Sequence, residues 1–305
     1  LARPPYNQFA KRGPRLAIAL RQRGSHTQRM KPVQIPFLPE IDWLPERIKA
    51  ATIKYGWAVT HIPKLNEVLE AFEDSKPWSL EQSTDLAAGM VRIRINQQPP
   101  KEIGLILGDI VHSLRSSLDY AVCGLVSLAD PNANLRKVQF PFGDLGKPLN
   151  SADRAPLKSI KDLALPYIEA ARSNGGEYLD VLNRVSNQDK HRLIVFTILR
   201  RMPMKVQINS DNNTADIIPD IDDLQTWMRP IQDGDVVEMG SMLALRPGFH
   251  IEDDSTPYAL AVINQMFVNT HLALAYMIKA AEVMLSAQGL PPQASNFSAP
   301  STPNG

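Results

Sequence analysis

The chain has 305 residues, of which 21% are charged and 44% are hydrophobic, a composition typical of a globular protein and not of a disordered or fibrous one. The 33 basic side chains nearly balance the 32 acidic ones. The single cysteine, Cys123, excludes a disulfide framework within the chain and fits a reducing, cytoplasmic location. Its place in an apolar helical pattern indicates a packing role.

The basic residues are unevenly distributed along the chain. Residues 1–31 carry eight Lys or Arg and no acidic side chain, which leaves 25 basic against 32 acidic side chains in the rest. We therefore expect residues 1–36 to form a disordered basic arm on an acidic body, and such an arm is able to contact nucleic acid. The alternative is that Met30 is the native start and that residues 1–29 are an upstream or engineered extension.

The first half of the chain predicts two long helices and a strand. Apolar residues recur at steps of three and four over residues 45–74, as on the buried face of a helix. Residues 90–96 alternate between apolar and polar, which predicts a strand. A second helical stripe covers residues 103–128 and consists of Ile103, Leu107, Ile110, Leu114, Leu118, Ala121, Leu125 and Leu128.

A long irregular connection follows over residues 130–159, with a short strand expected at 138–142. A helix over 159–173 should end at Gly175 and Gly176, because glycine suits the left-handed conformation after a helix. A short helix is expected over 177–185. Ser186 and Asp189 have the spacing of a capping box, which predicts a further helix from about residue 186 to 201, ended by Pro203.

The last third predicts strands and one long helix. Residues 205–209 and 214–218 are typical of a hairpin, and residues 235–245 and 249–253 add strand candidates. Residues 258–285 form the longest predicted helix, and its polar residues, including Asn264 and Lys279, interrupt it too often for a membrane span. His271 on this helix is expected to be a core histidine.

The predicted fold class is therefore α+β, mainly α. We expect a helical bundle with a small antiparallel β-sheet inserted before the last long helix. One domain is predicted over residues 37–286, with the β insertion at about 204–253 and a disordered tail over 287–305.

Two stretches hold the candidate functional residues. On the helix at 103–128, His112, Arg115 and Asp119 share one face, and Asp109 is positioned to orient the His112 ring. Arg115 and Asp119 are spaced to form an ion pair. The simpler interpretation is that these residues form the salt-bridged flank of a core helix.

The second stretch, residues 182–200, places Arg184, Asp189, Lys190, His191 and Arg192 near the predicted helix start. Basic side chains at the partly positive end of a helix suit a phosphate oxygen. The simpler interpretation is that Asp189 caps the helix and the basic residues are solvated.

Sequence motifs for cofactor chemistry are missing. The chain has no phosphate-binding loop, dinucleotide fingerprint or nucleophile elbow, and its six histidines have no short metal-ligand spacing. We therefore expect no cofactor and no metal, which leaves acid–base chemistry without a metal, or binding.

The two stretches, GDIVHSLRSSLDY and LNRVSNQDKHRL, resemble a broad group of uncharacterised bacterial and phage-associated proteins. In that group a helix with Gly-Asp-x-x-His-x-Leu-Arg-x-x-Leu-Asp precedes a later Asn-x-Asp-Lys-His-Arg, and then strands and a final helix. The likeness covers roughly residues 45–285. More distantly, the chain is similar to the HEPN superfamily of helical ribonucleases and toxins, on the strength of Arg184 followed by His191.

The HEPN resemblance implies metal-independent RNA cleavage through the substrate's 2′-hydroxyl. His191 would move the proton, and Arg184 or Arg192 would hold the phosphate. A homodimer is implied as well. The residues implied to support this site are Asn187, Asp189 and Lys190 beside His191, and Asp109, His112, Arg115 and Asp119 on the other helix.

The residues alone favour the less specific function. Ion-pair networks inside proteins use the same residue types as active sites, and the acidic body counts against broad nucleic-acid binding. The sequence therefore predicts a non-catalytic binding or scaffold module with a polar cluster at its core. The alternatives are a HEPN-like endoribonuclease or toxin, and a small-molecule or metal-dependent enzyme of unknown class.

Overall fold

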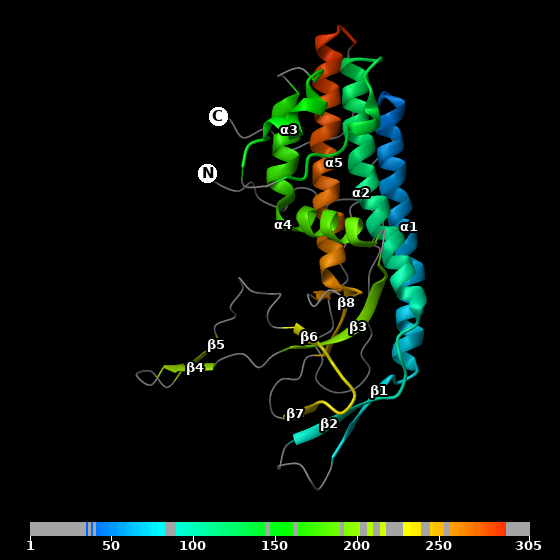
Figure 1. Cartoon of the computed structure of the whole chain (residues 1–305), viewed down its shortest axis with the longest axis vertical. Coiled ribbons are helices and arrows are strands. Elements are labelled where there is room, and N and C mark those ends of the chain that lie inside the picture. The colour runs from blue at the N-terminus through cyan, green and yellow to red at the C-terminus, as the bar shows by residue number, and fades with distance from the viewer. Residues whose placement is uncertain are drawn as a thin grey trace.

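The computed structural model describes residues 35, 38, 41–82, 90–143, 147–160, 164–189, 192–201, 206–209, 214–217, 228–238, 245–252 and 257–290. Residues 1–34 of the predicted arm and 291–305 of the predicted tail lie outside this part of the chain. The fold is α+β and mainly helical, as predicted, with long helices packed side by side and short antiparallel strands beyond one end of them (Figure 1). None of the described helices has the length and apolar content that crossing a membrane requires.

Four long helices form the bundle. They are α1 (Glu46–Asp74), α2 (Lys101–Ala129), α4 (Leu165–Asp189) and α5 (Ala261–Ala287). α2 packs against α1, α5 and α4, and α4 packs against α5 (Figure 1). α2 therefore contacts all three other long helices, and α5 does so as well, with its smallest contact to α1.

The helical periodicity predicted for α1, α2 and α5 is confirmed. On α1 the buried positions recur at steps of three and four, from Ile48 through Tyr55 to Phe72. α2 begins at Lys101, directly after Pro99 and Pro100. α5 begins at Ala261, after the two-residue strand β9 (Tyr258–Ala259).

α4 is longer than predicted and contains the expected glycine break. Its helical path is interrupted at Gly176, where φ is 57° and ψ is −160°, a backbone conformation that glycine adopts readily. The helix begins at Leu165 and not near residue 159, and Pro166 suits its first turn. Beyond the break it continues to Asp189, past the predicted end at residue 185.

The strands form antiparallel sheets. One sheet has the order β1-β2-β7 and consists of β1 (Trp78–Glu81), β2 (Met90–Ile95) and β7 (Val236–Glu238). A second has the order β6-β3-β8-β9, with β6 (Met228–Pro230), β3 (Ile194–Arg201) and β8 (Leu245–Ile251). The predicted hairpin is confirmed as β4 (Val206–Asn209) paired with β5 (Thr214–Ile217).

The predicted helix over 186–201 is wrong. Ser186 and Asp189 form the last turn of α4 and do not cap a new helix, and residues 194–201 are the strand β3. Ile194, Phe196 and Ile198 are buried while Val195 and Thr197 are half-buried, which is the two-residue period of a strand. The β-branched residues in this run favour the extended conformation.

The connection between α2 and α4 is irregular, as expected. It contains only short helices in its described residues: η2 (Leu135–Lys137), α3 (Ser151–Arg154) and η3 (Ala155–Leu157). The strand predicted at 138–142 is wrong, because these residues do not pair with any strand that the structure describes. The Phe140 N–H donates to the Asp119 carboxylate instead, and Pro141 has no N–H.

Two glycines allow α2 to approach its neighbours closely. A Cβ atom on Gly104 would overlap the carbonyl oxygen of Ile194, at the start of β3. A Cβ atom on Gly124 would overlap the side chain of Ile48 on α1. The backbone of α2 therefore lies in close contact with the start of β3 at Gly104 and with α1 at Gly124.

Gly104→Ala should destabilise the protein by about 2 kcal/mol or more, since the overlapped atom belongs to the backbone and cannot turn away. Gly56→Ala on α1 is the matched control, because a Cβ there meets nothing within 4 Å. That change should stabilise the protein by up to about 1 kcal/mol through helix propensity. Urea unfolding of both variants measures the difference, and equal effects would contradict the close packing of α2 on β3.

His271, on α5, is half-buried and lies against the core. Its ring centroid is 5.9 Å from that of Tyr55, and its Nδ1 has no hydrogen-bond partner among the described residues. Burial lowers the pKa of His271 to about 4. The folded protein therefore holds this imidazole in its neutral form.

This burial predicts a specific loss of stability in acid. An unfolded chain protonates His271 near its ordinary pKa of about 6.5, whereas the folded protein does so near 4, so stability falls as pH drops from about 6.5 to about 4. The loss from this group is about 3 kcal/mol at most. His271→Phe should unfold with a shallower pH dependence over this range. His250→Gln, which changes a half-buried histidine of β8, should keep the wild-type dependence, and the assignment fails if all three proteins give identical profiles.

Candidate functional site

The two candidate stretches meet in space, because the second half of α4 packs on α2. Asn183 of α4 contacts Arg115, and Asp189 of α4 lies beside Gly108. The two helices therefore run antiparallel at this contact. The residues form two groups about 10 Å apart along α2. We call Arg115, Asp119, Asn183 and Asn187 the inner cluster, and Asp109, His112 and Asp189 the outer group.

Arg115 is the centre of the inner cluster. Its side chain is only 11% exposed and forms the predicted ion pair with Asp119, one helical turn away. Its Nε donates a hydrogen bond of 3.1 Å to the Asn183 Oδ1, and its guanidinium carbon lies 4.3 Å from the centroid of the Phe142 ring. Arg115 thus joins α2, α4 and the segment after η2.

Asp119 connects the same segment through its second oxygen. Its Oδ1 accepts a hydrogen bond of 2.7 Å from the Phe140 N–H, while its Oδ2 faces Arg115. Cys123, one turn further along α2, donates through Sγ to the Val138 carbonyl at 3.5 Å. Burial, followed by the nearby charge of Asp119, raises the pKa of the Cys123 thiol, which agrees with its predicted packing role.

Asn183 is a member of the site that the sequence analysis missed. Its Oδ1 accepts from Arg115 and also from the Asn187 Nδ2, at 3.1 Å in each case. Asn183 precedes Asn187 by four residues, so both lie on one face of a helix that continues to Asp189. Because the prediction ended a helix at residue 185, this shared face was not recognised.

The outer group lies at the end of α4. The Asp189 carboxylate lies against Gly108, where a Cβ atom would come within 3.0 Å of Oδ2. Burial raises the pKa of the Asp189 carboxyl; the charge of His112 lowers it in part, and the charge of Asp109 raises it further. His112 is exposed, and its Nε2 lies 3.4 Å from the Ser116 hydroxyl, so the ring contact is with Ser116 and not with Asp109 as predicted.

Arg184 and Arg192 are both exposed. The Arg184 guanidinium carbon lies 5.5 Å from the centroid of the Tyr258 ring. The backbone N–H of Arg192 donates to the Gln188 carbonyl of the last turn of α4 at 3.1 Å. Arg192 is therefore at the partly negative end of a helix, not at the positive end that was predicted, and this end favours a cation over a phosphate.

Lys190 and His191 lie outside the described residues, between the end of α4 and the start of β3. The catalytic role predicted for His191 is therefore not tested by the geometry. In the part of the chain that the structure describes, no three His, Cys, Asp or Glu side chains gather closely enough to hold a metal ion. Comparisons of the chain with protein-family models, with curated proteins and with solved structures found no match.

The contacts of Arg115 predict a large stability cost for its removal. Arg115→Ala removes the ion pair with the half-buried Asp119 and one of the two donors to the Asn183 Oδ1, and should lower the free energy of unfolding by about 2 kcal/mol or more. Arg184→Ala is the matched control, since it removes an exposed arginine over a ring and should cost less than about 1 kcal/mol. Denaturant unfolding measures both, and a loss for Arg115→Ala no larger than that of the control would rule out a structural role.

Proposed function

We propose that this chain is a non-catalytic binding or scaffold module, in which the inner cluster is an internal network that fixes α4 and the segment after η2 on α2. The observation that carries the proposal is the enclosure of Arg115. Its guanidinium is turned toward Asp119, Asn183 and the Phe142 ring, all of which belong to the same chain. A group that holds a substrate phosphate needs donors directed at the substrate.

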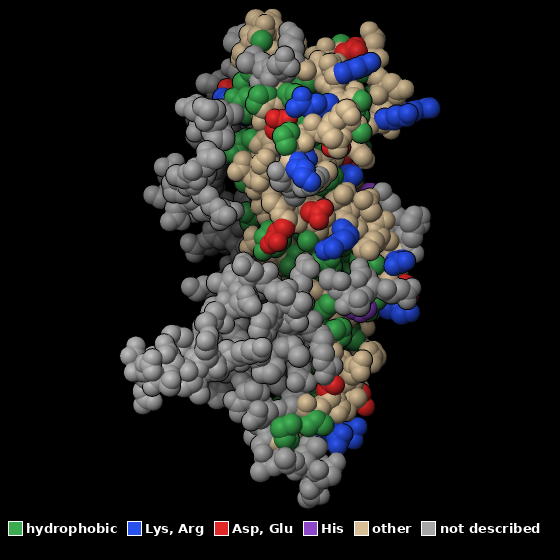
Figure 2. Space-filling view, turned by 60° about the vertical axis from the view of Figure 1, so that its left-hand side comes forward, with side chains coloured by type: hydrophobic (Ala, Val, Ile, Leu, Met, Phe, Trp, Pro, Cys, Tyr) green, Lys and Arg blue, Asp and Glu red, His purple; other side chains and the backbone are tan. Residues whose placement is uncertain are grey.

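The distribution of charge supports the same function. Over the described helices on the face in Figure 2, Lys and Arg side chains are interspersed with Asp and Glu. The outer group adds two carboxylates, Asp109 and Asp189, beside the end of α4. Binding to a nucleic-acid backbone rests on clustered positive charge. These features favour a protein partner over RNA.

The alternative is a HEPN-like, metal-independent endoribonuclease or toxin that functions as a homodimer. In it, His191 moves the proton, and Arg184 and Arg192 contact the phosphate. The observation in its favour is that both arginines are exposed near the end of α4 and therefore accessible to a substrate.

RNA cleavage distinguishes the two functions. The purified wild-type chain, incubated with single-stranded and structured RNA in EDTA, should release no more product than a heat-inactivated sample. His191→Ala, after circular dichroism has established that it is folded, should behave identically. Cleavage by the wild type that is lost in folded His191→Ala would overturn the non-catalytic function and establish the alternative.

A further inference from the structure

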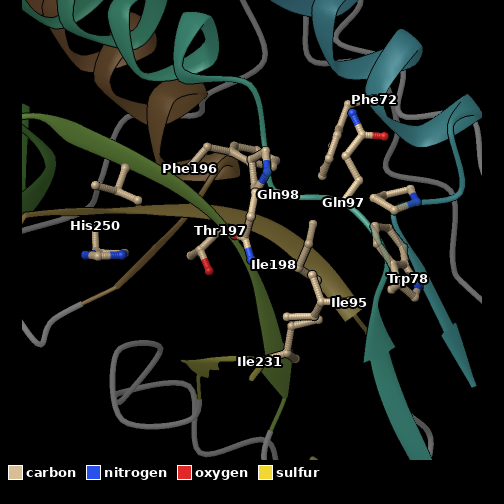
Figure 3. Close-up of a pocket in the computed structure, with 13 residues that line it drawn as sticks. Phe72, Trp78, Ile95, Gln97, Gln98, Phe196, Thr197, Ile198, Ile231 and His250 are labelled. Carbon is tan, nitrogen blue, oxygen red and sulfur yellow. The ribbon is translucent and has the colours of Figure 1, made fainter. Parts of the chain in front are cut away.

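A pocket lies between the two larger sheets, at the end of the bundle away from the inner cluster. Its volume is about 210 Å³. Apolar side chains from four elements converge on it, and two glutamines from the segment before α2 lie at its edge (Figure 3). Its walls include Phe72, Trp78, Ile95, Phe196 and Ile231.

The strand β3 turns one of its edges toward this pocket. The Ile198 carbonyl accepts from the Ile231 N–H at 2.9 Å, so it points away from β8. Pro247, which lies opposite Ile198 on β8, has no N–H and so cannot donate to the Ile198 carbonyl. The Leu193 carbonyl, in contrast, accepts from the Glu252 N–H, on the β8 side. Backbone groups alternate along an antiparallel strand, so the N–H and C=O of Phe196 point the same way as those of Ile198.

No described residue pairs with Phe196 on that edge. β6 pairs with Leu199–Arg201, and its continuation at Ile231 reaches only Ile198. In the other direction, the Ile194 carbonyl faces Gly104 of α2. Phe196 lies between these two contacts, at the wall of the pocket, and the residue as a whole is 5% exposed. At this position the N–H and C=O of a strand residue can form hydrogen bonds with one more extended segment.

The acidic side chains next to the pocket indicate the charge of the ligand that it would bind. The last turn of α1, which contributes Phe72, carries Glu70, Glu73 and Asp74. Burial, together with the charges of Asp74 and Glu70, raises the pKa of Glu73 to about 7. A positively charged side chain placed here would relieve the repulsion among these carboxylates.

We propose that this pocket binds a short extended peptide of a partner protein. One residue of the peptide pairs its C=O and N–H with the N–H and C=O of Phe196, as in strand addition to a sheet edge. An apolar side chain of the peptide fills the space between Trp78, Ile95 and Ile231, and a neighbouring Lys or Arg faces the acidic last turn of α1. The proposal rests on the non-catalytic binding function and deepens it by naming the class of partner.

A defined peptide tests the backbone pairing. The probe is fluorescein-labelled Thr-Val-Leu-Lys-Val-Thr with blocked ends, measured by fluorescence anisotropy up to about 1 mM protein. The matched ligand carries an N-methyl group on the leucine nitrogen, which removes one hydrogen-bond donor and keeps every side chain. We expect saturable binding of the probe and about tenfold weaker binding of the N-methyl peptide. A probe with Glu in place of Lys should also bind more weakly, with a difference that shrinks in high salt.

Two variants on one strand test the place of binding. Trp78→Ala removes a wall of the pocket, whereas Leu80→Ala changes an exposed residue of β1 that does not line it. With both variants folded by circular dichroism, we expect Trp78→Ala to weaken binding at least about fivefold and Leu80→Ala to leave it unchanged. In ¹⁵N-phenylalanine-labelled protein, the Phe196 amide should exchange more slowly once the peptide is bound.

Three results would overturn the peptide site: absence of binding to the folded wild type, equal binding of the N-methyl peptide, or unchanged affinity in Trp78→Ala. None of these three results concerns RNA. If one of them is obtained and the chain does not cleave RNA, the peptide site is wrong and the non-catalytic function still holds. Cleavage that depends on His191 would instead overturn the proposed function, whatever the peptide does.

Discussion

The structure depends on the close contact between α2 and the chain that passes from α4 into β3. Gly104 and Gly108 leave the surface of α2 bare where the Ile194 carbonyl and the Asp189 carboxylate lie against it. The contact sets where β3 begins and which of its backbone groups face α2. Because groups alternate along a strand, the orientation of the Ile194 carbonyl determines that of the Phe196 carbonyl, which no described residue pairs with at the pocket.

The inner cluster joins α4 to α2 further along the same face of α2, and it adds the segment after η2. Burying a charged guanidinium costs free energy unless its donors find partners, and Arg115 finds them on α2 itself, on α4 and in the ring of Phe142. These partners come from segments far apart in the sequence. The network therefore specifies one arrangement of α4 on α2, which an apolar contact of the same area would specify less strictly.

The sequence predicted the elements whose pattern has a single interpretation. The apolar stripes of α1, α2 and α5 are long enough for the helical period to be unambiguous, and the spacing of Arg115 and Asp119 predicted their ion pair. The run from residue 193 to 199 is apolar at almost every position, so its periodicity fits both a helix and a strand. Asn183 was missed as a consequence, and the role of Gly104 depends on a contact with β3 that no local pattern contains.

The two contacts of the Asp119 carboxylate affect how the protein unfolds locally. One oxygen faces Arg115 and the other accepts the Phe140 N–H, so the irregular segment after η2 has its backbone anchored to a helix by a side chain instead of by a neighbouring strand. Separating that segment from α2 exposes a carboxylate and an arginine together. Residues 138–142 and the middle of α2 therefore belong to one cooperative unit of local unfolding, although the segment has no regular secondary structure of its own.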